Sequence, residues 1–94
     1  MRRTKPEIVF AILEVIQENI AKKEEIRKTQ IMYRANLSFA QTNIYLSRLK
    51  DLDLISEIER EGENNKRYNV FELTENGYKF FRSLKSSFKL IKEI

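Results

Sequence analysis

Residues 30–49 read QIMYRANLSFAQTNIYLSRL, and this stretch decides the fold. Its pattern predicts a short helix, a tight turn at residues 36–37, and a second helix over about residues 39–52. Ser38 can accept a hydrogen bond from the amide of Gln41, and the Gln41 side chain can reach back to the Ser38 amide. This capping box fixes where the second helix begins. The whole stretch is therefore typical of a helix-turn-helix.

The second helix of this unit has the features of a recognition helix. Its apolar side carries Thr42, Leu46 and Leu49 at helical spacing. The other side is polar, and side chains of this kind can bind base edges in the major groove of DNA. The alternative interpretation is an ordinary solvated helix face. The candidate base-contacting residues are Ser38, Gln41, Asn43, Ser47 and Arg48.

Composition limits the classes of function. A chain of 94 residues with 41% hydrophobic residues is long enough for one domain with a modest core. Its 34% charged residues, two glycines and one proline indicate a mostly helical fold. The absence of cysteine and histidine removes the commonest nucleophiles, general bases and soft metal ligands. We therefore expect no enzyme, no metal, no cofactor and no small-molecule substrate.

Charge and hydropathy restrict the compartment and the partner. The formal net charge is +4, which suits nucleic acid but is also common among soluble proteins. No apolar run approaches the roughly 18 residues that a membrane span requires, and the basic start has no small-residue cleavage site. The sequence thus predicts a cytoplasmic protein, associated with the nucleoid, with no membrane partner.

Two further helices are predicted before the recognition helix. Apolar residues at spacings of three and four predict a helix over about residues 6–20, with Phe10 off its apolar face and free for a second contact such as a dimer partner. After a charged connector at residues 21–28, Thr29 is the expected cap of a short helix that ends near Ala35.

A hairpin and a last helix are predicted after it. Extended runs before and after the turn formers of residues 61–66 predict two strands, which beside three helices would make a wing. Thr74 then caps a helix in which Gly77 costs about 1 kcal/mol, a cost that a tight approach to a neighbour would explain. The predicted seam of a coiled-coil dimer on this helix is Phe81, Leu84, Phe88 and Ile91.

These blocks resemble a known family. IMY at residues 31–33, ANLS at residues 35–38, and LT at residues 73–74 followed by Gly77 are similar to the ten-kilodalton winged-helix DNA-binding, chromatin-associated proteins of crenarchaea. The resemblance covers about residues 6–84. It implies an archaeal homodimer that is paired through its C-terminal helix and binds double-stranded DNA with little sequence preference.

We therefore expect a mostly α, α+β fold: a winged helix-turn-helix with a two-stranded β-wing and a C-terminal dimerisation helix. Residues 1–74 would form the DNA-binding domain and residues 75–94 the coiled-coil-like dimerisation element. The function predicted is that of a dimeric DNA-binding protein, either a transcription regulator or an architectural chromatin protein. The alternative is a protein–protein interaction module that uses the acidic hairpin, which holds Glu57, Glu59, Glu61 and Glu63.

Basic and aromatic residues outside the recognition helix are candidates for backbone contacts. A basic arm of Arg2, Arg3 and Lys5 could reach the DNA backbone, although an untethered terminus explains these residues nearly as well. Half-buried packing is an equal alternative for Tyr33. The remaining candidates for contact with phosphates lie near the second helix or at the tip of the wing: Arg27, Lys28, Tyr33, Arg34, Lys66 and Arg67.

Overall fold

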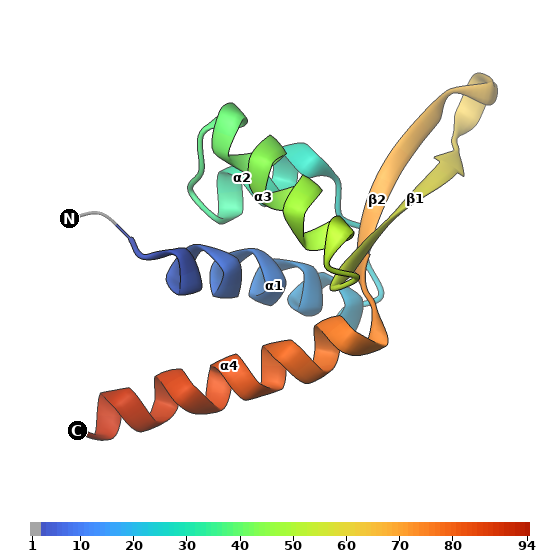
Figure 1. The fold of residues 1–94 in the computed structure, drawn as a ribbon. Coiled ribbons are helices and arrows are strands. Elements are labelled where there is room, and N and C mark those ends of the chain that lie inside the picture. The colour runs from blue at the N-terminus through green and yellow to red at the C-terminus, as the bar shows by residue number, and fades with distance from the viewer. Residues whose placement is uncertain (1–2) are drawn as a thin grey trace.

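The computed structural model describes residues 3–94, which form four helices and a two-stranded sheet (Figure 1). Their order along the chain is helix, helix, helix, strand, strand, helix. The elements are α1 (Lys5–Ala21), α2 (Lys28–Arg34), α3 (Phe39–Asp51), β1 (Ile55–Glu61), a 3₁₀ turn (Glu63–Asn65), β2 (Arg67–Leu73) and α4 (Glu75–Glu93).

Helix α1 is the centre of the arrangement. In Figure 1, α2 and α3 lie on one side of it, α4 runs antiparallel to it on the other side, and the β1–β2 hairpin projects away from the helices. The core is formed by side chains from all of these elements, with Ile12, Leu13, Ile16, Ile26 and Ile31 among the most deeply buried. This is a winged helix-turn-helix, so the predicted fold class is confirmed.

The start of α1 was correctly located. Thr4 caps the helix: its Oγ1 accepts from the Glu7 amide at 3.3 Å, and the Glu7 carboxylate accepts from the Thr4 amide at 3.0 Å. The backbone hydrogen bond from Thr4, then the one from its hydroxyl, hold the pKa of Glu7 below its ordinary value. Pro6 occupies the first turn, where its missing N–H leaves no gap in the helix.

The first three helices all end in the same way. Lys23, Asn36 and Asp53 each take the left-handed conformation just after a helix, with φ near +57° in each case (58°, 56° and 58°). The next amide then bonds back to a carbonyl five residues earlier, as Leu37 N does to Met32 O at 2.9 Å. Glycine usually occupies this position because an L side chain is disfavoured there. The turns of this chain are therefore made without glycine.

The start of α2 differs from the prediction. The N-cap is Arg27, not Thr29, and the helix begins at Lys28. The Gln30 side chain accepts from the Arg27 amide at 2.9 Å, which places Gln30 three residues after the cap. Just before the cap, Ile26 is buried, and its carbonyl accepts from the Phe71 amide of β2 at 3.0 Å. The connector is thus fixed to the sheet, and this fixes where α2 can begin.

The hairpin pairs in one register from base to tip. Ile55 lies opposite Leu73 at the base, and Glu61 lies opposite Arg67 near the tip. At the base, Ile55, Phe71 and Leu73 are buried in the core, whereas the tip is exposed. The hairpin therefore enters the core at one end only, and the other end is free to contact a partner.

Gly77 is required by a close approach, as predicted, although the neighbour is a turn and not a helix. A Cβ built at Gly77 would lie 1.9 Å from the carbonyl oxygen of Leu54, in the turn between α3 and β1. The α4 cap adjoins this turn, because Thr74 Oγ1 accepts from the Gly77 amide at 2.9 Å and donates to Asp53 O at 2.6 Å. The first turn of α4 is thereby tied to the end of α3.

Two expectations about apolar residues were wrong. Phe10 does not await a partner chain, because its ring stacks on Phe81 and meets Phe88 edge-on, with centroids 5.4 Å and 5.1 Å apart. Leu52 follows the end of α3 and is exposed, not part of its buried side. Between residues 3 and 94, no helix combines the length and apolar character needed to cross a bilayer.

Candidate nucleic-acid interface

The turn before α3 has the predicted geometry. Ser38 Oγ accepts from the Gln41 amide at 3.1 Å, and Gln41 Oε1 accepts from the Ser38 amide at 3.1 Å. The buried side chains of Ala35 and Leu37 anchor the turn on either side of the left-handed Asn36. This capping box uses Ser38 and the Gln41 side chain within the protein, so both contribute to the start of the helix whatever else they contact.

The exposed side of α3 is divided into two parts. Gln41, Ser47 and Arg48 are exposed, whereas Asn43 is half-buried. Asn43 lies in a hollow of about 230 Å³ between α3 and the sheet, whose lining includes Lys28, Ser47, Lys50 and Glu57. Asn43 therefore faces the base of the wing, while Gln41 and Arg48 face outward. The first half of the predicted reading surface is open, and Asn43 is only partly accessible.

Two cations at the helix-turn-helix are free of carboxylates. Arg48 forms no ion pair with any residue of the described chain. Lys28, at the first position of α2, has its Nζ 4.7 Å from the centre of the Phe39 ring. A cation over an aromatic face is held in place without being neutralised. Both side chains can therefore offer positive charge to a phosphate.

Arg34 is placed differently from its neighbours. Its Nη2 lies 2.7 Å from Glu18 Oε2, and its Nη1 donates to Asn19 Oδ1 of α1. Asn19 is buried, and its Nδ2 donates to the Glu25 carbonyl at 3.2 Å. Arg34 therefore joins α2 to α1 and to the connector, which is a structural role that the sequence did not predict. Tyr33, by contrast, is 75% exposed, so half-buried packing does not apply to it.

At the tip of the wing the two predicted cations differ. Arg67 Nη1 lies 2.9 Å from Glu59 Oε1, whereas Lys66 makes no ion pair within residues 3–94. Glu57 is likewise neutralised, by Lys50 Nζ at 2.7 Å. Two of the wing glutamates are thus paired within the chain. The acidity of the wing that faces solvent is concentrated at its tip.

Arg27 belongs to a group of side chains, here called the wing latch, that ties the connector to the wing. The Arg27 guanidinium lies 4.1 Å from the centre of the Tyr68 ring. Tyr68 Oη donates to Glu25 Oε1 at 2.8 Å, and Arg60 Nε lies 3.1 Å from Glu25 Oε2. Because Glu25 accepts from the neutral phenol, this hydrogen bond raises the pKa of Tyr68 above its ordinary value. The wing latch consists of Glu25, Arg27, Arg60 and Tyr68.

Sequence reasoning missed a second brace, at the turn before α3. Arg3 Nη2 donates to the carbonyls of Ala35 and Asn36, at 2.6 Å and 2.8 Å. These carbonyls lie at the end of α2, where a cation is favourable. Arg3 was expected in a free arm, and no sequence signal distinguishes an arm from a brace. Of the other arm residues, Arg2 lies outside the described residues and Lys5 is the first residue of α1.

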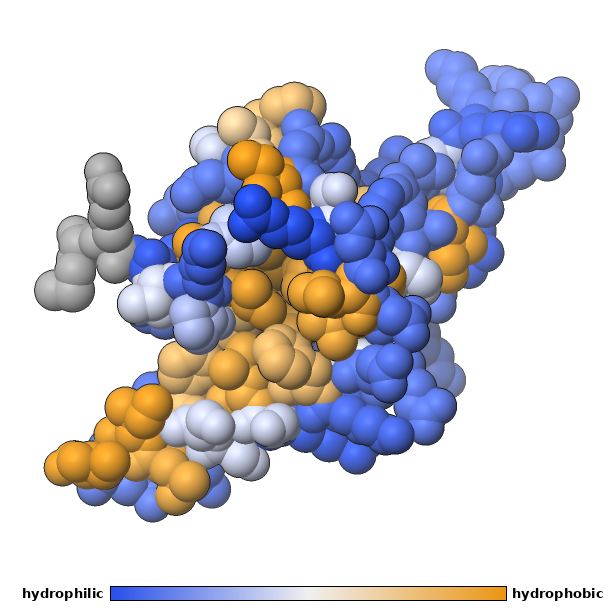
Figure 2. Space-filling view, in the orientation of Figure 1, coloured by the Kyte–Doolittle hydropathy of each residue, from blue (hydrophilic) through white to orange (hydrophobic). Residues whose placement is uncertain are grey.

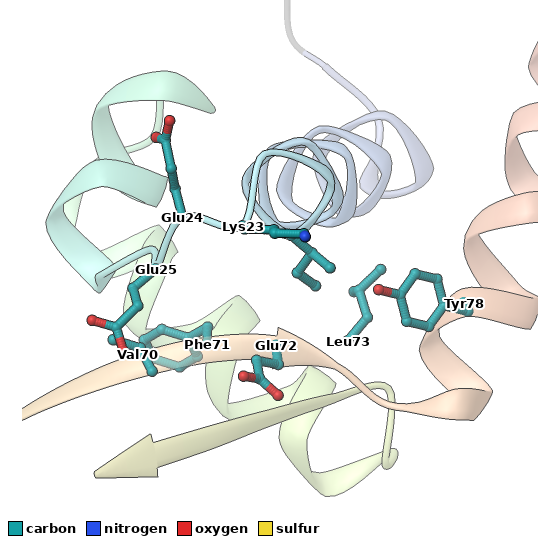
Figure 3. A pocket seen from close by; sticks show the side chains of 9 residues that line it. Lys23, Glu24, Glu25, Val70, Phe71, Glu72, Leu73 and Tyr78 are labelled. Atoms are coloured by element: carbon teal, nitrogen blue, oxygen red, sulfur yellow. The ribbon is translucent and has the colours of Figure 1, made fainter. Parts of the chain in front are cut away.

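A cleft of about 390 Å³ lies between the end of α1, β2 and the start of α4 (Figure 3). Lys23 and Tyr78 face each other across part of it, and Leu73 lies between them. Its polar groups are mainly the glutamates at positions 24, 25 and 72 on the rim. Residues 3–94 bring together no group of histidine, cysteine or carboxylate side chains that could hold a metal ion.

The predicted dimer seam on α4 lies partly inside the chain. Phe81 is only 7% exposed and Phe88 is half-buried, because both pack on Phe10. Leu84 is half-buried, and Ile91 is 62% exposed. Figure 2 shows apolar surface gathered at the free end of α4, at the lower left. The exposed large hydrophobic residues of α4 and the residue after it are Phe80, Leu90, Ile91 and Ile94.

Comparison with known proteins agrees with this geometry. Residues 2–92 match the family described as winged helix-turn-helix. The chain is 34% identical over 90 residues to the uncharacterized protein MJ0287 of Methanocaldococcus jannaschii, covering 96% of this chain and 78% of that protein.

Solved structures show the same fold. Sso10a-2, a DNA-binding protein from Sulfolobus solfataricus, superposes with a TM-score of 0.73 at 19% identity, over 97% of this chain and 84% of that one. A PadR-like transcriptional regulator from Bacillus cereus gives a TM-score of 0.76 at 16% identity, over 92% and 84%. The resemblance inferred from the sequence is thereby confirmed.

Proposed function

Because the chain belongs to the winged helix-turn-helix family, we propose that it binds double-stranded DNA as a homodimer, with α3 in the major groove and the wing near the minor groove. Membership of this family also confirms the prediction that the protein is not an enzyme. The observation that carries the proposal is the open side of α3, where Arg48 has no ion-pair partner in the described chain and Gln41 faces outward.

Cations placed around this helix support the proposal. Lys28 and Arg27 lie at the start of α2, which in a helix-turn-helix crosses the DNA backbone, and Lys66 lies at the tip of the wing. Phosphate contacts of this kind fix the position of the protein on the duplex, whereas contacts from α3 determine which bases it prefers. Tyr33, exposed on α2, can donate its hydroxyl to a phosphate in the same way.

Two roles fit such a protein. One is transcription regulation, and the other is the packaging of DNA as a nucleoid-associated chromatin component. Sso10a-2 is described as a DNA-binding protein, and the Bacillus cereus relative as a transcriptional regulator, so the likeness supports both roles. In either role residues 1–74 bind DNA, and residues 75–94 supply the dimer contact.

A mobility-shift titration with random-sequence duplex DNA tests the proposal. Saturable binding that weakens as salt rises is expected, because each neutralised phosphate releases counterions. The matched variants are Arg48→Ala, at the open side of α3, and Arg82→Ala, on the exposed surface of α4 away from α3. Weaker binding by the first variant alone supports the proposal. A protein that does not shift any duplex contradicts it.

A second candidate function rests on the acidity of the wing. Glu61 and Glu63 lie at the tip and form no ion pair within residues 3–94, so they are available to a basic partner protein. The same mobility-shift experiment separates the two candidates. If DNA binding is absent, and a Glu61→Gln, Glu63→Gln variant loses a protein partner that wild type binds, the wing is a protein interface.

A further inference from the structure

The centre of the open side of α3 is apolar. Ala40 and Ile44 lie one helical turn apart, opposite the buried side that carries Leu46 and Leu49. Ile44 is 48% exposed, and Ala40 is exposed as well. The residues singled out from the sequence for reading bases were polar ones, which flank this centre. The part of α3 that would go deepest into a groove is therefore a pair of aliphatic side chains.

The surroundings of this apolar centre suit DNA. Gln41 and Arg48 lie along one edge and Ser47 along the other, all exposed. Arg48 forms no ion pair with the described residues, so the edge carries an uncompensated positive charge. Asp51 shares the same face near the end of the helix, where it would repel phosphate. The first two turns of α3, and not its last, are thus suited to approach a duplex.

We propose that Ile44, with Ala40 beside it, contacts the 5-methyl groups of thymine in the major groove and gives the protein a preference for thymine-containing sites. This inference rests on the proposed function. In the major groove only thymine presents a methyl group, and apolar side chains recognise it. An exposed aliphatic pair gains nothing from phosphates or from the polar base edges, but it gains affinity by burying a methyl group.

The experiment compares two duplexes of the same random sequence, one with thymidine and one with deoxyuridine in its place. Uracil differs from thymine only by the absent methyl group. Burying one such group contributes about 0.8 kcal/mol, so wild type should bind the uracil duplex about three- to fourfold more weakly for each methyl contacted. Ile44→Ala should bind the two duplexes equally. Leu52→Ala removes an exposed aliphatic side chain beyond the end of the helix, so this control should keep the wild-type ratio.

The outcomes separate this inference from the proposed function. Equal binding of wild type to both duplexes overturns the inference and leaves DNA binding intact. An unchanged thymine-to-uracil ratio in Ile44→Ala also overturns it, because the difference would then come from the shape of the DNA. Loss of self-association in Ile44→Ala, without any change of the ratio, would assign this face to a protein contact instead. Failure of wild type to bind either duplex overturns the proposed function and this inference with it.

Discussion

Phe10 of α1 and Phe81 of α4 stack face to face, with ring centroids 5.4 Å apart and planes inclined by 11°. This contact within one chain uses a residue that the heptad pattern had placed between two chains. It turns the apolar stripe of α4 so that Phe81 and Phe88 face α1, while Ile91 and its neighbours toward the end face solvent. The dimer predictions below start from this orientation.

A dimer should therefore depend on Ile91 more than on Phe81. The exposed residues Leu90, Ile91 and Ile94 form an apolar end that a soluble monomer seldom leaves uncovered. Light scattering should return about twice the 11.3 kDa mass of one chain for wild type, and a monomer for Ile91→Lys. Ser86→Lys, on the polar side of α4, is the matched control and should stay dimeric. A wild-type monomer at micromolar concentration would contradict this prediction.

Arg48 and Arg34 should respond differently to the same substitution. Arg48→Ala removes a free cation, so DNA affinity should fall while the free energy of unfolding stays near that of wild type. If the protein is sequence-specific, the loss should be about 1–3 kcal/mol on its preferred site and smaller on random DNA. Arg34→Ala removes the contacts to Glu18 and Asn19, so it should lower stability by about 1–3 kcal/mol because Asn19 is left buried with an unmet acceptor. Urea unfolding and DNA titration of both variants check the contrast.

Lys28→Ala should flatten the salt dependence of DNA binding. Each phosphate neutralised on duplex DNA adds about 0.9 to the slope of log affinity against log salt, so one contact per chain lowers it by roughly that amount. Arg67→Ala should have a smaller effect, since Arg67 already pairs with Glu59. Titrations of both variants at several salt concentrations measure the two slopes. Identical slopes for wild type and Lys28→Ala would remove Lys28 from the interface.

Gly77→Ala should destabilise the protein strongly. The added Cβ would lie 1.9 Å from Leu54 O, and this neighbour is backbone that cannot move aside as a side chain would. Overpacking of this kind should cost about 3 kcal/mol in the free energy of unfolding. Gly62→Ala is the control, since its Cβ would approach only to 3.3 Å of the Tyr68 ring, and we expect it to stay within about 1 kcal/mol of wild type. Chemical denaturation of both variants compares them.

The wing latch should weaken at high pH. Tyr68 donates to Glu25 only as the neutral phenol, and its pKa in the folded chain is raised above the ordinary value of 10.0. The contribution to stability is therefore complete below the unfolded pKa, and is lost as pH rises through the raised folded pKa. Glu25→Gln should move the pKa of Tyr68 back toward its ordinary value. The tyrosinate absorbance of this variant, with a Tyr68→Phe protein to identify the residue, measures the shift.

Local signals predicted most of the fold. The capping residues Thr4, Ser38 and Thr74 lie where hydroxyl caps were expected, because a cap is a relation between residues close in sequence. The start of α2 was misplaced because a distant strand holds the connector: Phe71 bonds to Ile26. Periodicity can show that Phe81 lies on an apolar stripe of α4. It cannot show whether the residue that covers this stripe comes from α1 or from a second chain.

The candidate site was predicted less completely, for a similar reason. The sequence identifies which side chains carry charge, but pairing depends on contacts that span the chain, such as that of Arg34 with α1 or of Arg3 with the turn at Asn36. Sequence reasoning also favoured polar residues for base contacts. It therefore passed over Ile44, whose exposure follows only from knowing which side of α3 is buried.

The wing latch has a consequence for how recognition proceeds. With Glu25 holding both Arg60 and Tyr68, the wing is fixed to the connector before any duplex arrives, so little conformational entropy remains to be lost on binding. The spacing between α3 and the tip of the wing is then set by the protein alone. A duplex whose grooves do not match that spacing must bend or twist to fit, and its stiffness would become part of what the protein selects.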